Sequence, residues 1–144
     1  MNNNTPQYPD LQGKVALVTG GNRGLGLAIA KILAKQNCKL VLAAQSKEKL
    51  QTAAQEIQQL SGHIPTTHAA NLKSLHECQK LHDLVKSTHG KCHILINSAG
   101  DTQSGPFLQQ DDQTWIDGFN LKFYATVRLS RMLWPMLAKN NGAI

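Results

Sequence analysis

The chain has 144 residues, of which 41% are hydrophobic and 17% charged, and a formal net charge of +6. This length allows one domain with a core of its own, and the composition is typical of a soluble globular protein. No apolar run is long enough to span a membrane, so we expect no membrane partner. The basic charge raises nucleic acid as a partner, but the 15 lysines and arginines are dispersed without interleaved aromatic residues, and we expect none.

Three cysteines and six histidines raise the question of disulfides and metals. Cys38, Cys78 and Cys92 show no Cys-x-x-Cys spacing. An odd, scattered set of this kind favours reduced thiols in a cytoplasmic protein. His76, Cys78 and His82 lie on a predicted helix at spacings that place them on different faces, so we expect no metal site.

The first elements surround a glycine-rich segment. Residues 1–10 are polar and contain two prolines, and we expect a flexible tail there without a secretion signal. Residues 15–18 form an apolar run, typical of a strand buried on both faces. Gly20, Gly24 and Gly26 follow, and apolar residues then recur at helical spacing. A strand, a glycine-rich turn and a helix in this order predict a phosphate cradle, because the helix N-terminus presents free N–H groups.

The rest of the chain alternates between apolar runs and amphipathic segments. We expect strands over residues 39–44, 64–70 and 92–97, the second of them at the sheet edge because Pro65 lies near its start. We expect helices over residues 47–60, 72–89 and 112–139. Ser46 should cap the first of these helices, and Pro135 should bend the last or end it early. Trp115 and Trp134 are expected to be packing residues, and Ala143-Ile144 begins a fifth strand.

Strands that alternate with helices predict right-handed crossovers and a mostly parallel sheet. The expected fold class is α/β, a Rossmann-type doubly wound sheet over residues 11–144 that stops at the start of its fifth strand. In such a sheet ligands bind at the carboxyl ends of the strands, where the strand order reverses. Thr19-Gly20 ends the first strand and the segment 97–100 ends the fourth, so both turns should face one crevice.

The segment from Thr19 to Gly26, Thr-Gly-Gly-Asn-Arg-Gly-Leu-Gly, resembles the cofactor turn of the short-chain dehydrogenase/reductase family. Asn97-Ser98-Ala99-Gly100 is similar to that family's Asn-Asn-Ala-Gly signature, with serine at its second place. The resemblance runs from about Leu11 to Ile144. It implies an NAD(P)-dependent oxidoreductase that transfers hydride between its cofactor and a small carbonyl or alcohol substrate. It also implies that residues 112–139 match the helix that family members often pack into homo-oligomers.

The resemblance further implies the residues of the site. The glycine-rich turn should wrap the pyrophosphate, and the fourth-strand turn should border the cofactor ribose. Asn71 and Leu72 stand where the family has an acidic residue that contacts adenine, followed by an aliphatic residue. Asn120 matches a helix asparagine that supports the family's proton relay through a water, although a simple packing role stays open. The expected cofactor-binding residues are Gly20, Asn22, Arg23, Gly24, Leu25, Gly26, Gln45, Ser46, Asn71, Leu72, Asn97, Ala99 and Gly100.

The end of the second strand decides between the two nicotinamide cofactors. An Asp or Glu about 20 residues past the glycine turn would bind the ribose 2′-OH and repel a 2′-phosphate. This chain has Gln45 and Ser46 there, and Arg23 and Lys47 add positive charge that suits a phosphate. We expect NADP, with NAD as the alternative, although family members that prefer NADP often have arginine in place of Gln45.

The family's catalytic serine and Tyr-x-x-x-Lys pair have no match in the 144 residues. Four places after Tyr8 and Tyr124 stand Gln12 and Arg128, although carbonyl reduction needs an acid that donates a proton. Three hypotheses remain: the cofactor-binding part of an interrupted oxidoreductase, a non-catalytic dinucleotide- or partner-binding half-domain, and a basic nucleic-acid binder. We favour the first, because without a fifth strand residues 92–97 form an apolar edge, and the isolated chain should then be poorly soluble or pair through it.

Overall fold

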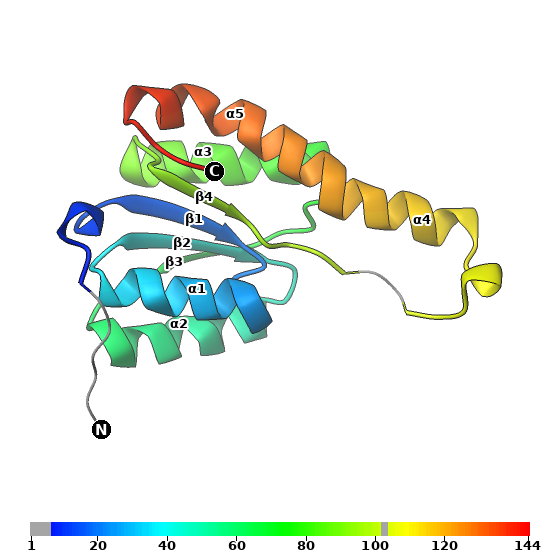
Figure 1. Ribbon diagram of the computed structural model, residues 1–144, viewed down its shortest axis with the longest axis horizontal. Helices are drawn as coiled ribbons and strands as arrows, with labels where there is room; N and C mark the ends of the chain where they lie inside the picture. The colour runs from blue at the N-terminus through cyan, green and yellow to red at the C-terminus, as the bar shows by residue number, and fades with distance from the viewer. Residues whose placement is uncertain (1–6, 102–103) are drawn as a thin grey trace.

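The computed structural model describes residues 7–101 and 104–144, over which the chain forms one parallel sheet covered by helices (Figure 1). The strands lie in the order β3-β2-β1-β4, and every pairing between them is parallel. The predicted Rossmann-type α/β fold is therefore confirmed. Its strands and helices are β1 (Val15–Thr19), α1 (Gly24–Lys35), β2 (Lys39–Ala44), α2 (Lys47–Ser61), β3 (Thr66–Ala69), α3 (Leu75–His89), β4 (Ile94–Asn97), α4 (Asp112–Phe119) and α5 (Ala125–Lys139).

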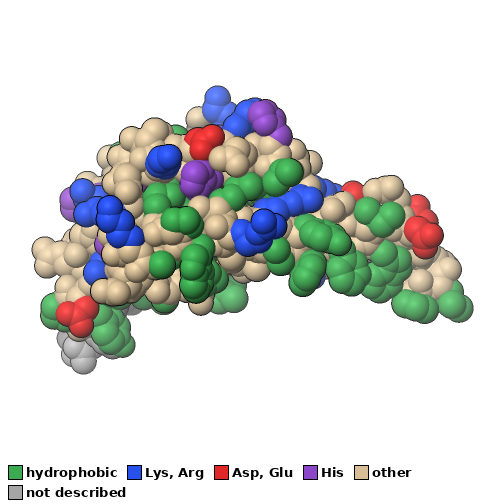
Figure 2. Space-filling model, turned by 90° about the horizontal axis from the view of Figure 1, so that it is seen from above, with side chains coloured by type: hydrophobic (Ala, Val, Ile, Leu, Met, Phe, Trp, Pro, Cys, Tyr) green, Lys and Arg blue, Asp and Glu red, His purple; other side chains and the backbone are tan. Residues whose placement is uncertain are grey.

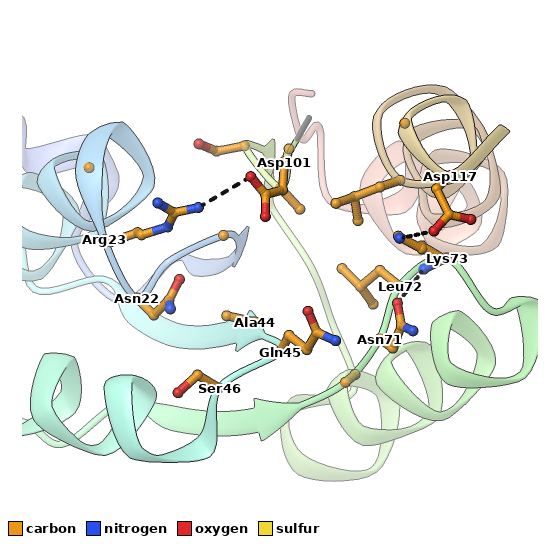
Figure 3. A pocket seen from close by; sticks show the side chains of 18 of the residues that line it. Asn22, Arg23, Ala44, Gln45, Ser46, Asn71, Leu72, Lys73, Asp101 and Asp117 are labelled. Atoms are coloured by element: carbon orange, nitrogen blue, oxygen red, sulfur yellow. Dashed lines mark hydrogen bonds and ion pairs between the residues drawn. The ribbon is translucent and has the colours of Figure 1, made fainter. Parts of the chain in front are cut away.

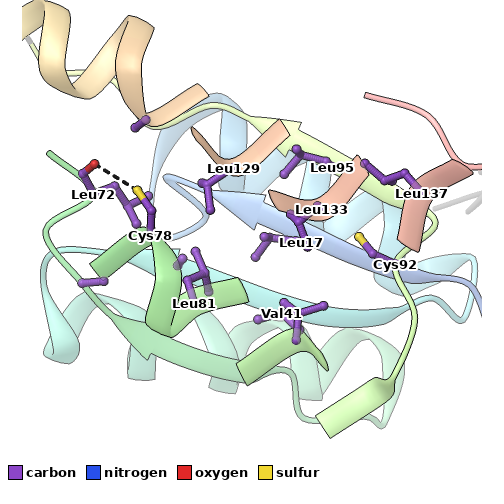
Figure 4. Close-up of a cluster of buried hydrophobic side chains, with 14 residues drawn as sticks. Leu17, Val41, Leu72, Cys78, Leu81, Cys92, Leu95, Leu129, Leu133 and Leu137 are labelled. Atoms are coloured by element: carbon purple, nitrogen blue, oxygen red, sulfur yellow. Dashed lines mark hydrogen bonds between the residues drawn. The ribbon is translucent and has the colours of Figure 1, made fainter. Parts of the chain in front are cut away.

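The sheet separates two hydrophobic clusters, one on each face. Helices α3 and α5 cover the face that carries Leu17, Val41 and Leu95 (Figure 4). Helices α1 and α2 cover the opposite face, where Ala16 and Val18 lie. Because successive side chains of a strand point to opposite faces and both faces are covered, β1 is buried along its whole length. This double burial explains its continuous apolar sequence.

Helix caps lie where the sequence predicts them. Ser46 Oγ accepts a hydrogen bond from the Lys49 N–H at 3.3 Å and caps α2. Gly62 ends the same helix in the left-handed conformation. The third strand is shorter than the predicted 64–70, because Pro65 has no N–H to donate to the ladder. β3 begins at the next residue and forms the predicted edge of the sheet.

The predicted helix over residues 112–139 is one continuous helical segment, in which a π-helical turn, Asn120–Tyr124, joins α4 to α5. It runs on past Pro135, so the proline does not end it early. Figure 1 shows α5 beside α3 on the sheet, whereas α4 projects beyond the sheet. Trp115 and Trp134 are 41% and 61% exposed. Trp115 packs edge-to-face against Phe107, with the ring centres 5.9 Å apart, as a packing residue would, but neither tryptophan belongs to the core.

Both ends of the described chain are held by hydrogen bonds. Ala143 forms a parallel bridge with Ile94, and its N–H donates to the carbonyl just before β4 at 2.8 Å. This pairing confirms the predicted start of a fifth strand. Residues 1–6 of the predicted flexible tail lie outside the described residues, and the Tyr8 N–H donates to Gln36 Oε1 at 2.7 Å. Within the described ranges, no helix has both the length and the apolar character needed to cross a membrane.

Candidate functional site

A cavity of about 1230 Å³ lies at the carboxyl ends of the strands, where the sequence predicts a cofactor crevice (Figure 3). Its walls come from the turns after β1 and β4, the residues that follow β2 and β3, and one side of α4. Because β2 and β4 flank β1, the strand order reverses at this point. The predicted cofactor residues that line the cavity are Gly20, Asn22, Arg23, Gly24, Leu25, Gln45, Ser46, Asn71, Leu72, Ala99 and Gly100.

The two remaining predicted residues, Gly26 and Asn97, are not in the cavity lining. A Cβ at Gly26 would collide with the Gly20 carbonyl oxygen, and a Cβ at Gly20 would lie 2.7 Å from the Ser98 carbonyl oxygen. The turn after β1 therefore packs, backbone against backbone, on α1 and on the turn after β4. Asn97 is directed toward α5, where its Nδ2 donates to Ser130 Oγ at 3.5 Å.

This packing brings the N-terminus of α1 to the cavity. The helix begins at Gly24, and the preceding Arg23 makes no side-chain capping hydrogen bond to it. The first N–H groups of the helix are therefore left for a ligand or water. Such a terminus carries partial positive charge and binds anions. The glycine cradle and the helix terminus together fit the pyrophosphate of a dinucleotide.

A buried threonine that the sequence analysis did not select fixes the turn after β4. Thr19 is 2% exposed, and its Oγ1 accepts hydrogen bonds from the Ser98 and Ala99 N–H groups, both at 3.1 Å. The same hydroxyl donates to the Ile96 carbonyl at 3.3 Å. The sequence did contain a signal for this role, because Thr19 places a hydroxyl at the end of an apolar strand. A buried hydroxyl needs hydrogen-bond partners, and here the neighbouring turn supplies them.

Two cations lie on the wall formed by the β1 turn and α2. Arg23 Nη2 lies 3.7 Å from Asp101 Oδ1, and both side chains are largely exposed, so this ion pair is weak. Lys49 lines the cavity, whereas Lys47, which was predicted to add positive charge there, does not. Lys49 is brought to the cavity because its N–H donates to the Ser46 cap, which lines the same wall.

The opposite wall contains an ion pair that the sequence analysis missed. Lys73 Nζ donates to Asp117 Oδ2 at 2.6 Å (Figure 3). This bond, and a second one from Gln113 Nε2 at 2.9 Å, lower the pKa of Asp117 from its ordinary value. Because 44 residues separate Lys73 from Asp117, no local pattern indicates the pair and only the fold brings it together.

The structure does not bring Asn120 to the cavity. Asn120 begins the π-helical turn and borders a second hollow, on the surface of α4, together with Trp115, Ile116, Phe119, Phe123 and Tyr124. Its support of a proton relay stays a prediction, since the Tyr-x-x-x-Lys pair of that relay does not occur in the 144 residues.

Metal-binding side chains do not gather in residues 7–101 and 104–144, where no group of three His, Cys, Asp or Glu residues could hold an ion. Cys38, Cys78 and Cys92 are buried free thiols. Burial raises the pKa of all three, which keeps them protonated and poorly nucleophilic.

The sheet, the glycine cradle and the cavity at the strand ends define a Rossmann-type α/β domain with the geometry of a dinucleotide site. Residues 14–144 match the family model described as short chain dehydrogenase. The chain therefore belongs to the short-chain dehydrogenase family.

Curated relatives match nearly the whole of this chain but only part of their own length. An uncharacterized oxidoreductase of Staphylococcus aureus is 33% identical over 133 residues, which cover 92% of this chain and 56% of the relative. Nodulation protein G of Rhizobium sp. is 34% identical over 136 residues, which cover 94% of this chain and 54% of the relative. The chain thus spans about half the length of the curated relatives it matches.

Solved structures show the same partial coverage. The structure of L-sorbose reductase from Gluconobacter frateurii, complexed with NADPH and L-sorbose, is similar with a TM-score of 0.83 and 31% identity, over 89% of this chain and 49% of that chain. A metagenomic short-chain oxidoreductase in complex with NADP is similar with a TM-score of 0.84 and 30% identity, over 92% of this chain and 60% of that chain.

Proposed function

We propose that this chain binds NADP and forms the cofactor-binding part of an oxidoreductase that transfers hydride between NADPH and a small carbonyl or alcohol substrate. The packing of Gly20 and Gly26 carries the proposal, because it places the N-terminus of α1 at the cavity between the strand ends. The free N–H groups of that terminus would hold the pyrophosphate. The nicotinamide supplies the hydride chemistry when the cofactor is bound.

The charges that line the cavity favour NADP over NAD. A carboxylate after β2 would bind the ribose 2′-OH and repel a 2′-phosphate, but Gln45 and Ser46 stand there. Arg23 and Lys49 line the same cavity, and the planar guanidinium of arginine matches a phosphate with two parallel donors. The similar structures complexed with NADPH and with NADP support this choice.

The tyrosines of this chain are poor candidates for the proton donor. Neither Tyr8 nor Tyr124 lines the cavity, and neither is followed by lysine four places on. The Arg128 guanidinium lies over the Tyr124 ring, 5.5 Å from its centre, which favours a structural role for that side chain. We therefore assign hydride transfer to the whole protein. A non-catalytic dinucleotide- or partner-binding half-domain is the second candidate for these 144 residues.

Calorimetric titration of the 144-residue chain with NADP and with NAD tests the cofactor proposal. We expect NADP to bind more tightly. Arg23→Gln should lower the ratio of NADP to NAD affinity by about tenfold, because it removes a charge-assisted hydrogen bond to the 2′-phosphate. Lys35→Gln removes the same charge at the far end of α1 and should leave the ratio unchanged. Binding of neither nucleotide would refute the proposal.

The exposed apolar face of α4 and the π-helical turn supports association into a homo-oligomer. Ile116, Phe119 and Phe123 are each more than half exposed, and Figure 2 shows hydrophobic side chains gathered over this helix. A contiguous apolar patch of this kind marks an interaction surface. Sedimentation velocity should show an oligomer that Phe119→Glu shifts toward monomer, while Ile64→Glu, at a site 66% exposed elsewhere, should not. A monomeric unmodified chain would contradict this part of the proposal.

The same proposal includes a cytoplasmic location and no nucleic-acid or membrane partner. The free, buried cysteines support a reducing compartment. Binding to DNA or RNA that weakens steeply with salt would contradict the exclusion of nucleic acid.

A further inference from the structure

The Lys73–Asp117 bridge connects two walls of the cavity that the sequence does not link. Lys73 follows β3 and the predicted adenine-contacting residues Asn71 and Leu72, whereas Asp117 lies on α4. Of the ion pairs that the described residues form, this one joins α4 to the segment between β3 and α3. Both members line the cavity (Figure 3).

Lys73 is also held through its backbone. Its carbonyl accepts a hydrogen bond from Arg128 Nη1 of α5 at 2.8 Å, and its N–H donates to Asn71 Oδ1 at 3.3 Å. Leu72, between them, is 2% exposed, and its carbonyl accepts from Cys78 Sγ at 3.3 Å (Figure 4). The position of Lys73 therefore determines where the Asn71 amide lies in the cavity wall.

Both carboxylate oxygens of Asp117 in this bridge accept hydrogen bonds. The Lys73 and Asp117 side chains are 35% and 43% exposed, and Gln113 Nε2 occupies the second carboxylate oxygen. Helix α4 projects beyond the sheet (Figure 1), and the bridge joins it to the segment 71–73. With its charge balanced by Asp117, Lys73 is not presented to a phosphate as a free cation.

We propose that Lys73 and Asp117 are positioning residues for the adenosine end of the cofactor. The bridge holds the segment 71–73 against α4, and so fixes the Asn71 side chain at the distance that the base requires. This proposal rests on the proposed binding of NADP.

The test compares single substitutions on both sides of the bridge. Lys73→Met and Asp117→Asn change the charge of the wall in opposite directions, so a purely electrostatic effect on an anionic ligand would also be opposite. If the bridge positions the wall, both variants should weaken binding of adenosine 2′,5′-bisphosphate by about twofold to fivefold, the range that a half-exposed ion pair supports. Lys73→Arg retains the pair and should restore the affinity.

Two controls separate positioning from general loosening of the fold. Lys80→Met breaks an ion pair of similar length on α3, 2.8 Å from Glu77, and should leave adenosine 2′,5′-bisphosphate binding unchanged. Nicotinamide mononucleotide, titrated by NMR, lacks the adenosine end and should bind all variants equally. Thermal unfolding should show similar losses for Lys73→Met and Lys80→Met.

The possible results distinguish failure of the positioning role from failure of the proposed NADP binding. Tighter binding in Asp117→Asn would show that Lys73 contacts the phosphates directly and would overturn the positioning role. Unchanged affinity in both bridge variants, or an equal loss for nicotinamide mononucleotide, would also overturn it while the proposed function stands. If the unmodified chain binds neither NADP nor adenosine 2′,5′-bisphosphate, the proposed function fails and the positioning role fails with it.

Discussion

Gly24 offers a way to separate the phosphate site from the stability of the fold. The residue has φ +55° and lines the cavity, and apart from its chain neighbours and the backbone of its own helix no atom lies within 4 Å of the position a Cβ would take. In Gly24→Ala the methyl group would stand where a pyrophosphate approaches the backbone, and the left-handed conformation costs about 1–2 kcal/mol. We expect the free energy of unfolding to fall by about that amount. NADP affinity should fall by at least about tenfold, which equals ~1.4 kcal/mol of binding free energy.

Gly62→Ala is the matched control. Gly62 has φ +75° and equally open space around its Cβ position, but it caps α2 and does not line the cavity. Its replacement should therefore lower the free energy of unfolding by a similar ~1–2 kcal/mol and leave NADP affinity unchanged. Urea unfolding and calorimetric titration of both variants measure the two effects separately. Equal affinity loss in both variants, or no loss in either, would refute the placement of the pyrophosphate at α1.

Two further predictions concern hydrogen bonds that hold the sheet and its turns. Thr19→Val removes a buried hydroxyl and leaves two N–H groups unpaired, so urea unfolding should show a loss of about 2–4 kcal/mol. Thr19→Ser keeps the hydroxyl, and its free energy of unfolding should fall by only about 1 kcal/mol. If the two variants were equally stable, the hydrogen bonds of the hydroxyl would not be what stabilises the turn. The Val15 N–H donates to His93 Nδ1 at 3.0 Å. Burial of the imidazole and, to a smaller extent, the positive charges of two nearby lysines lower the pKa of His93 below its ordinary value of 6.5. The unfolded chain therefore takes up a proton at higher pH than the folded chain, and stability should decrease as the pH falls below about 6.5. His93→Asn retains an acceptor without titrating, so an acid-induced loss as steep as that of the unmodified chain would contradict this reasoning.

The sheet and the cavity walls at the strand ends could be predicted because local patterns encode them. Residues 15–18 of β1 are all apolar, since both faces of the strand are covered. The glycines at positions 20 and 26 are required where backbone meets backbone, so their spacing marks the turn. Ser46 and Gly62 bound α2 through their own side-chain and backbone chemistry. Each of these signals lies within a few residues of the structure that it determines.

The wall formed by α4 could not be predicted, because it depends on where that helix lies. The apolar residues of segment 115–123 have the spacing of a core-facing helix, yet α4 lies beyond the sheet and Phe119 is 56% exposed. Asp117 is one acidic residue on an amphipathic helix, a pattern typical of a solvated face. Only the fold shows that Lys73 meets it. Likewise, the lysine that lines the cavity from α2 is Lys49, because the Ser46 cap orients the first turn of that helix.

Helix α4 therefore joins two surfaces that the sequence presents as unrelated. One side of the helix forms a cavity wall through Asp117, and the exposed apolar side chains of Ile116 and Phe119 lie beside it in the sequence. If association orders α4, it also fixes the bridge to Lys73 and the adjoining Asn71. Coupling between two binding events is reciprocal, so cofactor binding should then strengthen association by the same factor by which association strengthens cofactor binding. The coupling should be lost in Lys73→Met, which leaves the apolar face intact, and this separates the bridge from the contact surface itself.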